Sequence, residues 1–207
     1  MAGPEAEGVN ASRDEQSGGP ERGERATTPI LRGARVVLRP VVDTDIPALE
    51  AILREPEVAR WWMRDTWDRV DEESSVVFSI LADGAVVGCI EYAEETDPDY
   101  RHAGVDLFIS TGRQGRGIGA DALRTLIAYL LGDLGHHRVI IDPAVENERA
   151  IHVYEKLGFR RVGVMRRYER AVDGEWRDGL LMELLAEDFA RTPADALGPP
   201  PAKGADA

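Results

Sequence analysis

The sequence predicts a mixed α/β fold, and three observations support this prediction. A glycine-rich run at 112–120 lies between an apolar stretch at 105–110 and an amphipathic stretch at 118–131, which is the pattern of a strand followed by a helix. A second apolar stretch followed by a second helical stretch comes further along the chain. Two Asp-Gly pairs, at 83–84 and 173–174, each separate strand-like runs, as the turns of β-hairpins do.

Each predicted element has a local signal. Asp43 and Thr44 are residue types that begin helices, because their side chains accept hydrogen bonds from free backbone N–H groups. Apolar residues within 150–157 recur three and four positions apart, on one helix face, and Gly158 suits the left-handed position that ends a helix. In chain order, the predicted elements are strand 35–39, helix 43–54, helix 57–62, strands 75–81, 85–92 and 105–110, helix 118–131, strand 139–141, helix 150–157, and strands 160–170 and 178–185.

The glycine-rich run is the strongest functional signal, because a glycine turn that opens a helix can bind an anion. The first N–H groups of a helix have no intrahelical partner, and the helix dipole favours negative charge there. The run is not a P-loop, because no Lys-Ser/Thr pair follows its last glycine. It holds only half of the Gly-x-Gly-x-x-Gly dinucleotide fingerprint. The sequence therefore predicts a site for another phosphate-bearing ligand, with a simple tight turn as the structural alternative.

Two motifs in sequence order resemble one enzyme superfamily. Residues 114–119 read Gln-x-x-Gly-x-Gly, which resembles the pyrophosphate loop of the GNAT acyl-CoA N-acyltransferases. Residues 147–159 read Asn-x-x-Ala-x-x-x-Tyr-x-Lys-x-Gly-Phe, which is similar to the strand–helix–turn unit that follows this loop in the superfamily. The resemblance implies a GNAT fold, with a mixed, mostly antiparallel central sheet, strands splayed around the acyl-CoA site and helices on both faces.

The resemblance also implies acetyl-CoA as co-substrate and no metal. Backbone groups at 108–110 would hold the acyl arm, N–H groups at 114–120 would hold the pyrophosphate, and Asn147 would contact the pantetheine. The residues implied for acyl-CoA binding are Phe108, Ile109, Ser110, Gln114, Gly115, Arg116, Gly117, Ile118, Gly119, Ala120, Asn147 and Tyr154.

Amine acetylation needs two proton transfers, and two residues are candidates for them. The acceptor amine must lose a proton, since a lysine-like amine has a pKa of about 10.4. The resemblance implies that Tyr154 faces the thioester sulfur and is the acid. The structural alternative is that Tyr154 is only an aromatic residue of the core. Asp106 stands in an otherwise apolar strand, where an ionised carboxylate is costly unless it is paired. Asp106 is therefore a functional candidate, with water as the alternative base.

The acidic residues resemble one family within this superfamily, the aminoglycoside 6′-N-acetyltransferases. The similar features include the Trp61-Trp62 pair, the Glu-Glu-Thr-Asp-Pro run at 94–98, the Gly-Val-Asp run at 104–106 and the Asp-Pro pair at 142–143. The resemblance implies that Asp106 binds the reacting amine and serves as base. It further implies an acceptor site formed by Trp62, Asp97, Asp106, Asp142 and Asp173, although the tryptophan pair could also be core.

Composition limits the class of protein. The chain has 207 residues and a formal net charge of −13, which argues against nucleic acid as a partner and suits a cationic substrate such as an aminoglycoside. It shows no apolar run long enough to span a membrane, and a single cysteine suits a reducing cytoplasm. Residues 1–29 and 191–207 are predicted to be disordered tails around an acetyltransferase domain at 30–190. We expect a monomer or a homodimer.

Other functions stay open. A GNAT enzyme acting on a protein N-terminus, or on a lysine-like amine such as a siderophore precursor, would share the acyl-CoA residues. It would not need several separated carboxylates. A non-catalytic GNAT-fold protein that only binds acyl-CoA would not need both Asp106 and Tyr154.

Overall fold

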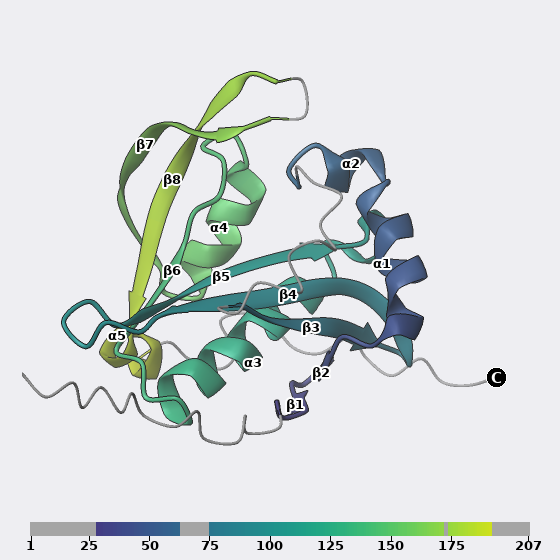
Figure 1. Ribbon diagram of the computed structural model, residues 1–207, viewed down its shortest axis with the longest axis horizontal. Helices are drawn as coiled ribbons and strands as arrows, with labels where there is room; N and C mark the ends of the chain where they lie inside the picture. The colour runs from purple at the N-terminus through teal and green to yellow at the C-terminus, as the bar shows by residue number, and fades with distance from the viewer. Residues whose placement is uncertain (1–27, 63–74, 172–173, 192–207) are drawn as a thin grey trace, which may run out of the picture.

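The computed structural model describes residues 28–62, 75–171 and 174–191, and their strands form one eight-stranded sheet in the order β1-β2-β3-β4-β5-β6-β8-β7 (Figure 1). The strands are β1 (Leu31–Arg32), β2 (Val37–Pro40), β3 (Ser75–Ala82), β4 (Ala85–Glu95), β5 (His102–Ile109), β6 (Arg138–Ile141), β7 (Arg160–Arg170) and β8 (Trp176–Leu185). The helices are α1 (Ile46–Leu53), α2 (Pro56–Ala59), α3 (Ile118–Gly132), α4 (Glu148–Lys156) and α5 (Ala186–Arg191), with short 3₁₀ turns at Asp43–Asp45 and Thr111–Arg113.

The expected mixed, mostly antiparallel sheet is confirmed, because only the β5–β6 pair is parallel. Two elements were not predicted. Strand β1 has two residues and α5 has six, and such short pieces carry no periodic pattern. The expected tails at 1–29 and 191–207 lie almost entirely outside the described residues, so the domain limits at 30 and 190 remain a proposal.

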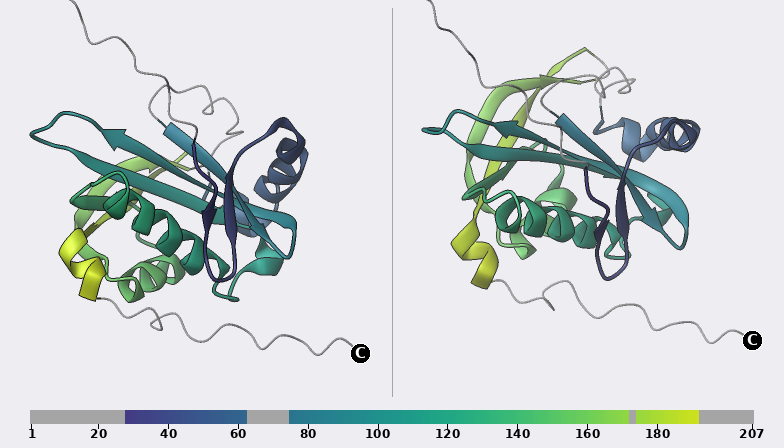
Figure 2. Two further views of the ribbon diagram at one scale, coloured as in Figure 1. Left: turned by 90° about the horizontal axis from the view of Figure 1, so that it is seen from below. Right: turned by 60° about the horizontal axis from the view of Figure 1, so that its bottom comes forward.

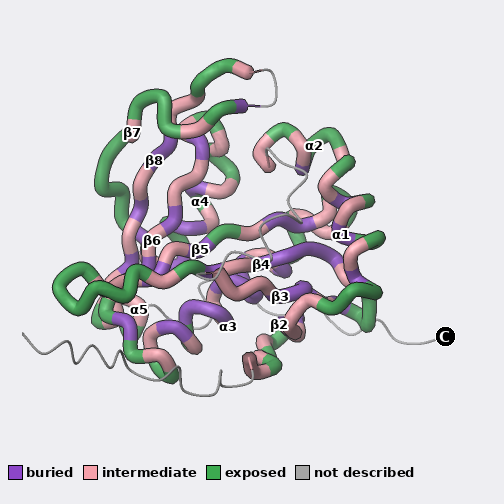
Figure 3. The backbone as a smooth tube through the Cα atoms, in the orientation of Figure 1, coloured by how far each residue is buried: buried purple, intermediate pink, exposed green. Residues whose placement is uncertain are grey.

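Helices cover both faces of the sheet, as expected, with α3 and α4 on one face and α1 and α2 on the other (Figure 2). The face under α3 forms the main core, in which apolar side chains are fully buried (Figure 3). Burying each such side chain stabilises the fold by about 1.5–3 kcal/mol. The largest of them in this core are Leu38, Phe78, Ile80, Ile90, Leu123, Leu126, Ile127, Leu130, Leu157, Met182 and Leu184. Among the described residues, no helix is long and apolar enough to cross a membrane.

Strands β5 and β6 separate soon after they meet. They pair only at Ala103 with Val139 and at Gly104 with Ile140. Beyond this point β5 continues to Ile109 along β4, while β6 continues along β8. The two strands therefore diverge toward the C-terminal end of β5 (Figure 1).

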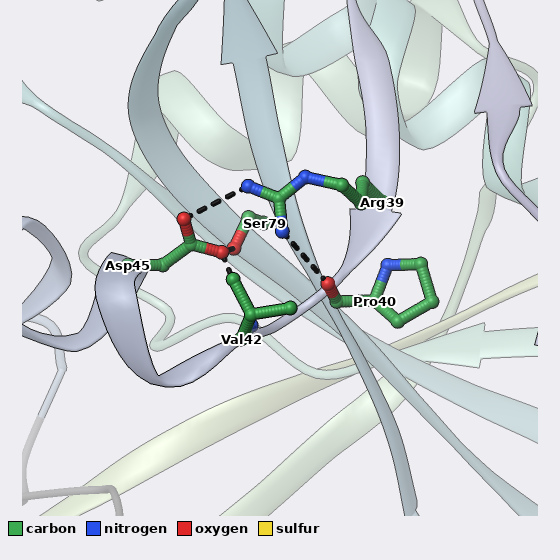
Figure 4. A network of polar contacts seen from close by, with 5 residues as sticks. All are labelled: Arg39, Pro40, Val42, Asp45 and Ser79. Atoms are coloured by element: carbon green, nitrogen blue, oxygen red, sulfur yellow. Dashed lines mark hydrogen bonds and ion pairs between the residues drawn. The ribbon is translucent and has the colours of Figure 1, made fainter.

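A buried carboxylate fixes α1 to the second face of the sheet (Figure 4). Asp45, just before α1, accepts hydrogen bonds from Arg39 Nη2 at 2.8 Å, Ser79 Oγ at 2.6 Å and the Val42 N–H group at 3.2 Å. Burial raises the pKa of Asp45, but these hydrogen bonds outweigh it and hold the pKa below its usual value. Because α2 follows α1 directly, this network also positions the tryptophan pair after α2.

Candidate active site

The glycine-rich loop has the geometry of an anion site. Gly115 and Gly117 have φ values of 74° and 76°, in the left-handed region that residues with a Cβ rarely adopt. Gly117 is the N-cap of α3, so the first N–H groups of this helix lack intrahelical partners and remain available to a ligand. A Cβ at Gly117 would lie 3.4 Å from Arg35 Nε, so the loop is also closely packed. The loop therefore fits a bound pyrophosphate.

Two carboxylates that the sequence did not single out hold this loop in place. Glu55 accepts hydrogen bonds from Ser110 Oγ at 2.8 Å and from the Thr111 N–H group at 2.6 Å, at the beginning of the loop. Burial raises the pKa of Glu55, but these hydrogen bonds outweigh burial, so the pKa lies below its usual value and the carboxylate stays charged at neutral pH. Asp121 in α3 accepts hydrogen bonds from three consecutive backbone N–H groups at 34–36. That segment carries Arg35, whose Nη1 donates to the Arg116 carbonyl at 3.2 Å.

A cleft of about 810 Å³ opens between the glycine loop, the end of β5 and α4. Most of the residues predicted to bind acyl-CoA line it, together with one predicted acceptor residue. These are Phe108, Ile109, Gln114, Gly115, Gly117, Gly119, Ala120, Asn147, Tyr154 and Trp62. Three of the residues predicted to bind acyl-CoA do not line the cleft: the Ser110 side chain is bonded to Glu55, Arg116 is exposed and Ile118 is buried in the core. The predicted acceptor residues Asp97, Asp106 and Asp142 do not line it either.

Helix α4 forms the opposite wall of the cleft. Asn147 caps this helix, and its side-chain oxygen accepts from the Ala150 N–H group at 3.2 Å. Arg149 reaches across the cleft, where its Nη1 donates to Gln114 Oε1 at 2.7 Å. Gln114 in turn donates through Nε2 to the Ile109 carbonyl at 2.8 Å. The sequence did not identify Arg149, because its α4 position carries no signal beyond a surface charge.

Tyr154 both packs in the core and faces the cleft. It is 8% exposed, and its ring centroid lies 6.0 Å from that of Phe159. Burial raises the pKa of its hydroxyl, and the negative charges of Asp106 and Asp142 raise it further. The hydroxyl therefore keeps its proton through the neutral pH range, as an acid must before it donates.

The Asp106 side chain is exposed, so the expectation that burial makes this carboxylate costly is wrong. The residues on either side, Val105 and Leu107, turn toward the main core, whereas Asp106 points to the opposite face. Helix α1 covers that face only at its other end, around Phe108. Directly opposite Asp106 on β4 stands Glu91, which shares the same face.

Further acidic residues lie near Asp142. Besides the two predicted aspartates, Asp106 and Asp142, they are Glu146 and Glu169. Burial raises the pKa of Glu169; Arg177 opposes this shift, while Asp142 and Glu146 add to it. Asp142 and Glu146 are thus close enough to Glu169 to raise its pKa, and of these carboxylates Glu146 lines the cleft. Glu169 belongs to the arginine-rich strand β7, and no sequence signal marks it.

The remaining predicted acceptor residues are spread out. Asp97 lies in the exposed loop between β4 and β5, where its Oδ1 accepts from the Asp99 N–H group at 2.9 Å. Four residues of β5 separate that end of the strand from Asp106, a distance of about 13 Å. Trp62 packs edge-on against Phe108 at 5.0 Å, so it is part of a small core as well as of the cleft wall. Asp173 lies outside the described residues.

The chain is similar to known proteins both in sequence and in fold. The family model described as "Acetyltransferase (GNAT) domain" matches residues 35–160. Spermidine N(1)-acetyltransferase of Escherichia coli K12 is 26% identical over 182 residues, covering 81% of this chain and 97% of that protein. Aminoglycoside N(6′)-acetyltransferase type 1 of Klebsiella pneumoniae is 29% identical over 155 residues, covering 63% of this chain and 76% of that protein. Among solved structures, Mycobacterium smegmatis RimJ in complex with CoA-disulfide has a TM-score of 0.68 and 26% identity, covering 82% of this chain and 90% of that one.

Proposed function

The chain belongs to the GNAT acetyltransferase family, and from this premise we propose that it acetylates a primary amine of a small polycation, with the 6′-amino group of an aminoglycoside as the first candidate acceptor. One observation carries the proposal. Tyr154 faces the phosphate-binding cleft and also lies within the electrostatic reach of carboxylates on the acceptor side. In the proposed enzyme, Tyr154 is the proton donor at which the acetyl-CoA site and the site for the cationic acceptor meet.

The cleft suits acetyl-CoA, which supplies an activated acetyl thioester. In the proposed complex, the free N–H groups of the glycine loop hold the pyrophosphate, and the backbone at 108–110 holds the acyl arm. Asn147 contacts the pantetheine through the part of its carboxamide not used as the helix cap. No metal takes part in the proposed reaction.

Two side chains transfer protons in the proposed reaction. Asp106, exposed on the acceptor face, accepts a proton from the acceptor ammonium or orients a water that does so, and the neutral amine then attacks the thioester carbonyl. Tyr154, with its raised pKa, donates a proton to the departing sulfur. The nitrogen loses its second proton to water or to the tyrosinate as the amide forms and the carbon–sulfur bond breaks, so that the reaction releases one proton and solvent exchange restores both side chains.

A polyamine such as spermidine is the second candidate acceptor. The Escherichia coli spermidine N(1)-acetyltransferase aligns over 97% of its length, more than the aminoglycoside enzyme. Both kinds of acceptor carry several ammonium groups, which the separated carboxylates would attract.

An acceptor panel tests the proposal. Purified protein is incubated with acetyl-CoA and, separately, with kanamycin, spermidine, putrescine, a simple monoamine and a peptide with a free N-terminal alanine. Thiol release gives the rate, and mass spectrometry gives the site of acetylation. We expect the polycations to be acetylated with kcat/KM well above that of the monoamine and the peptide. Preference for the peptide would make the chain an N-terminal acetyltransferase, and acetyl-CoA binding without turnover would make it a binding protein.

A further inference from the structure

Strand β7 is interrupted beside the acceptor site. Met165 pairs with Gly179 and Glu169 pairs with Arg177, so that residues 166–168 lie opposite a single residue of β8. Arg167 has a φ of 51°, an uncommon left-handed value for a residue other than glycine. Its N–H group donates to the side chain of that single residue, Asp178, at 2.7 Å. Such bulges change the direction of a side chain, and here the next residue is Tyr168.

The ring of Tyr168 lies over a glycine of the neighbouring strand. A Cβ built on Gly179 would be 2.7 Å from Tyr168 Cδ1, so the ring needs a residue without a side chain at this position. Gly179 pairs with Ala144, and the next N–H group, that of Leu180, donates to the Pro143 carbonyl at 2.8 Å. The ring therefore lies beside the segment that begins immediately after Asp142.

Tyr168 is also in electrostatic contact with the acceptor carboxylates. Partial burial raises the pKa of its hydroxyl, and the neighbouring Asp142 carboxylate raises it further, as do the charges of Glu169 and Asp106. The phenol therefore stays neutral and able to donate. Its side chain is nevertheless 48% exposed, on a strand that is exposed along most of its length (Figure 3). A residue this exposed adds little to the core.

We propose that Tyr168 is a positioning residue of the acceptor site. Its hydroxyl orients the Asp142 carboxylate toward an acceptor ammonium, and its ring forms the side of the site next to β7 and β8. A carboxylate with one oxygen held by a phenol presents the other oxygen in a fixed direction. The exposed ring also offers a face to a cation. The proposal rests on the proposed function, because it assigns a residue to the acceptor half of the same site.

The first test removes only the hydroxyl. In a steady-state assay with the better acceptor of spermidine and kanamycin, Tyr168→Phe should raise the acceptor KM about three- to tenfold, as expected for one lost hydrogen bond. The kcat and the KM for acetyl-CoA should stay within about twofold of wild type, because the contact serves acceptor binding. Tyr100→Phe is the matched control, since Tyr100 is 73% exposed in the loop between β4 and β5. It should leave all three values unchanged.

The second test asks whether Tyr168 acts through Asp142. In an Asp142→Asn background, Tyr168→Phe should change the acceptor KM less than twofold, because the two residues would act as a unit. Gly179→Ala should raise the acceptor KM in the wild type by pushing the ring away. The same substitution should have no effect in a Tyr168→Ala background, where the clash is gone.

The outcomes separate this proposal from the proposed function. If wild type acetylates no amine, both are wrong. If it acetylates the acceptor and Tyr168→Phe behaves like Tyr100→Phe, the function stands and the role of Tyr168 is wrong. Equal effects of Tyr168→Phe with and without Asp142→Asn, or a fall in kcat at constant acceptor KM, would also overturn it.

Discussion

Asp106 and Tyr154 approach the proposed reaction centre from different sides. Asp106 stands on the open face of β5, and Tyr154 is buried on the inward face of α4. An exposed carboxylate can exchange protons with water and with a substrate amine, whereas a buried phenol keeps its proton. The two environments thus assign opposite roles to the two side chains.

Asp106→Asn should lower kcat/KM for the acceptor a hundredfold or more, the range typical of a lost general base. Because the side chain is exposed, the thermal midpoint should change little. Steady-state kinetics and a melting curve on the same preparation measure both. An active, folded variant with near-normal kcat/KM would mean that water or another carboxylate takes the proton.

Tyr154→Phe should reduce kcat on the order of a hundredfold and leave the affinity for CoA unchanged. In wild type, the raised pKa of Tyr154 predicts no loss of kcat through its ionisation up to pH 10, the usual value for tyrosine. A pH profile from 6 to 10 checks this expectation. A decline below pH 10 that disappears in Tyr154→Phe would show that the phenol ionises early.

The glycine loop and helix α3 act as one element, because Gly117 both ends the loop and caps the helix. Gly117→Asp should weaken CoA binding strongly, since like charges 4 Å apart cost about 4 kcal/mol at an effective dielectric near 20. The positive φ adds strain, while the neighbouring Arg35 offsets part of the repulsion. Calorimetry with CoA measures the loss. Gly112→Asp, in the same run but with open space around it, is the control and should bind normally.

The anchoring of α1 gives a prediction about stability and pH. Asp45→Asn should destabilise the fold by about 2 kcal/mol at pH 7, because a charged hydrogen-bond acceptor is lost. The folded pKa of Asp45 lies below its unfolded value, so its contribution is complete above about pH 4 and is lost as the pH falls through the folded pKa. Urea unfolding should therefore give a difference between variant and wild type that shrinks near pH 3. The exposed neighbour variant Asp43→Asn should match wild type at both pH values.

The elements that carry strong local patterns could be predicted from the sequence, and these also carry the cofactor half of the site. The glycine run and the α4 motif lie within short segments, and the structure brings them together around one cleft. The acceptor half depends on contacts between distant residues. Nothing local reveals that β7 bulges at Arg167, or that Glu55 reaches Ser110. Burial of Asp106 was wrongly expected, because the pattern of apolar residues in a strand does not tell which part of a sheet face a helix covers.

At the scale of the whole molecule, the predicted acceptor carboxylates are spread out, so the length of the acceptor should decide how many of them it contacts. Asp142→Asn should raise the KM of a polycationic acceptor about tenfold to a hundredfold with little change in kcat, because a charge-assisted hydrogen bond contributes mainly to binding. Asp97→Asn should have such an effect only on a long acceptor. That acceptor must span the roughly 13 Å between Asp106 and the end of β5 that the Asp97 loop joins.

Kinetics at low and high salt test this assignment. Salt should weaken wild-type binding more than that of Asp142→Asn, since screening acts on the charge that the variant lacks. A monoamine should respond to neither substitution. Equal responses of a monoamine and a polycation would contradict the proposed role of both carboxylates.

The hydrogen bonds from residues 34–36 to Asp121 have a consequence for synthesis on the ribosome. The bonded groups stand 85 to 87 residues apart along the chain. At 5–20 residues per second, the three N–H groups wait about 4 to 17 seconds before their acceptor is even made. The segment that carries Arg35, which supports the glycine loop, can therefore be fixed only after much of the sheet has been translated. A nascent chain that ends at residue 120 would contain the glycine loop but would lack the Asp121 carboxylate that holds the segment supporting it.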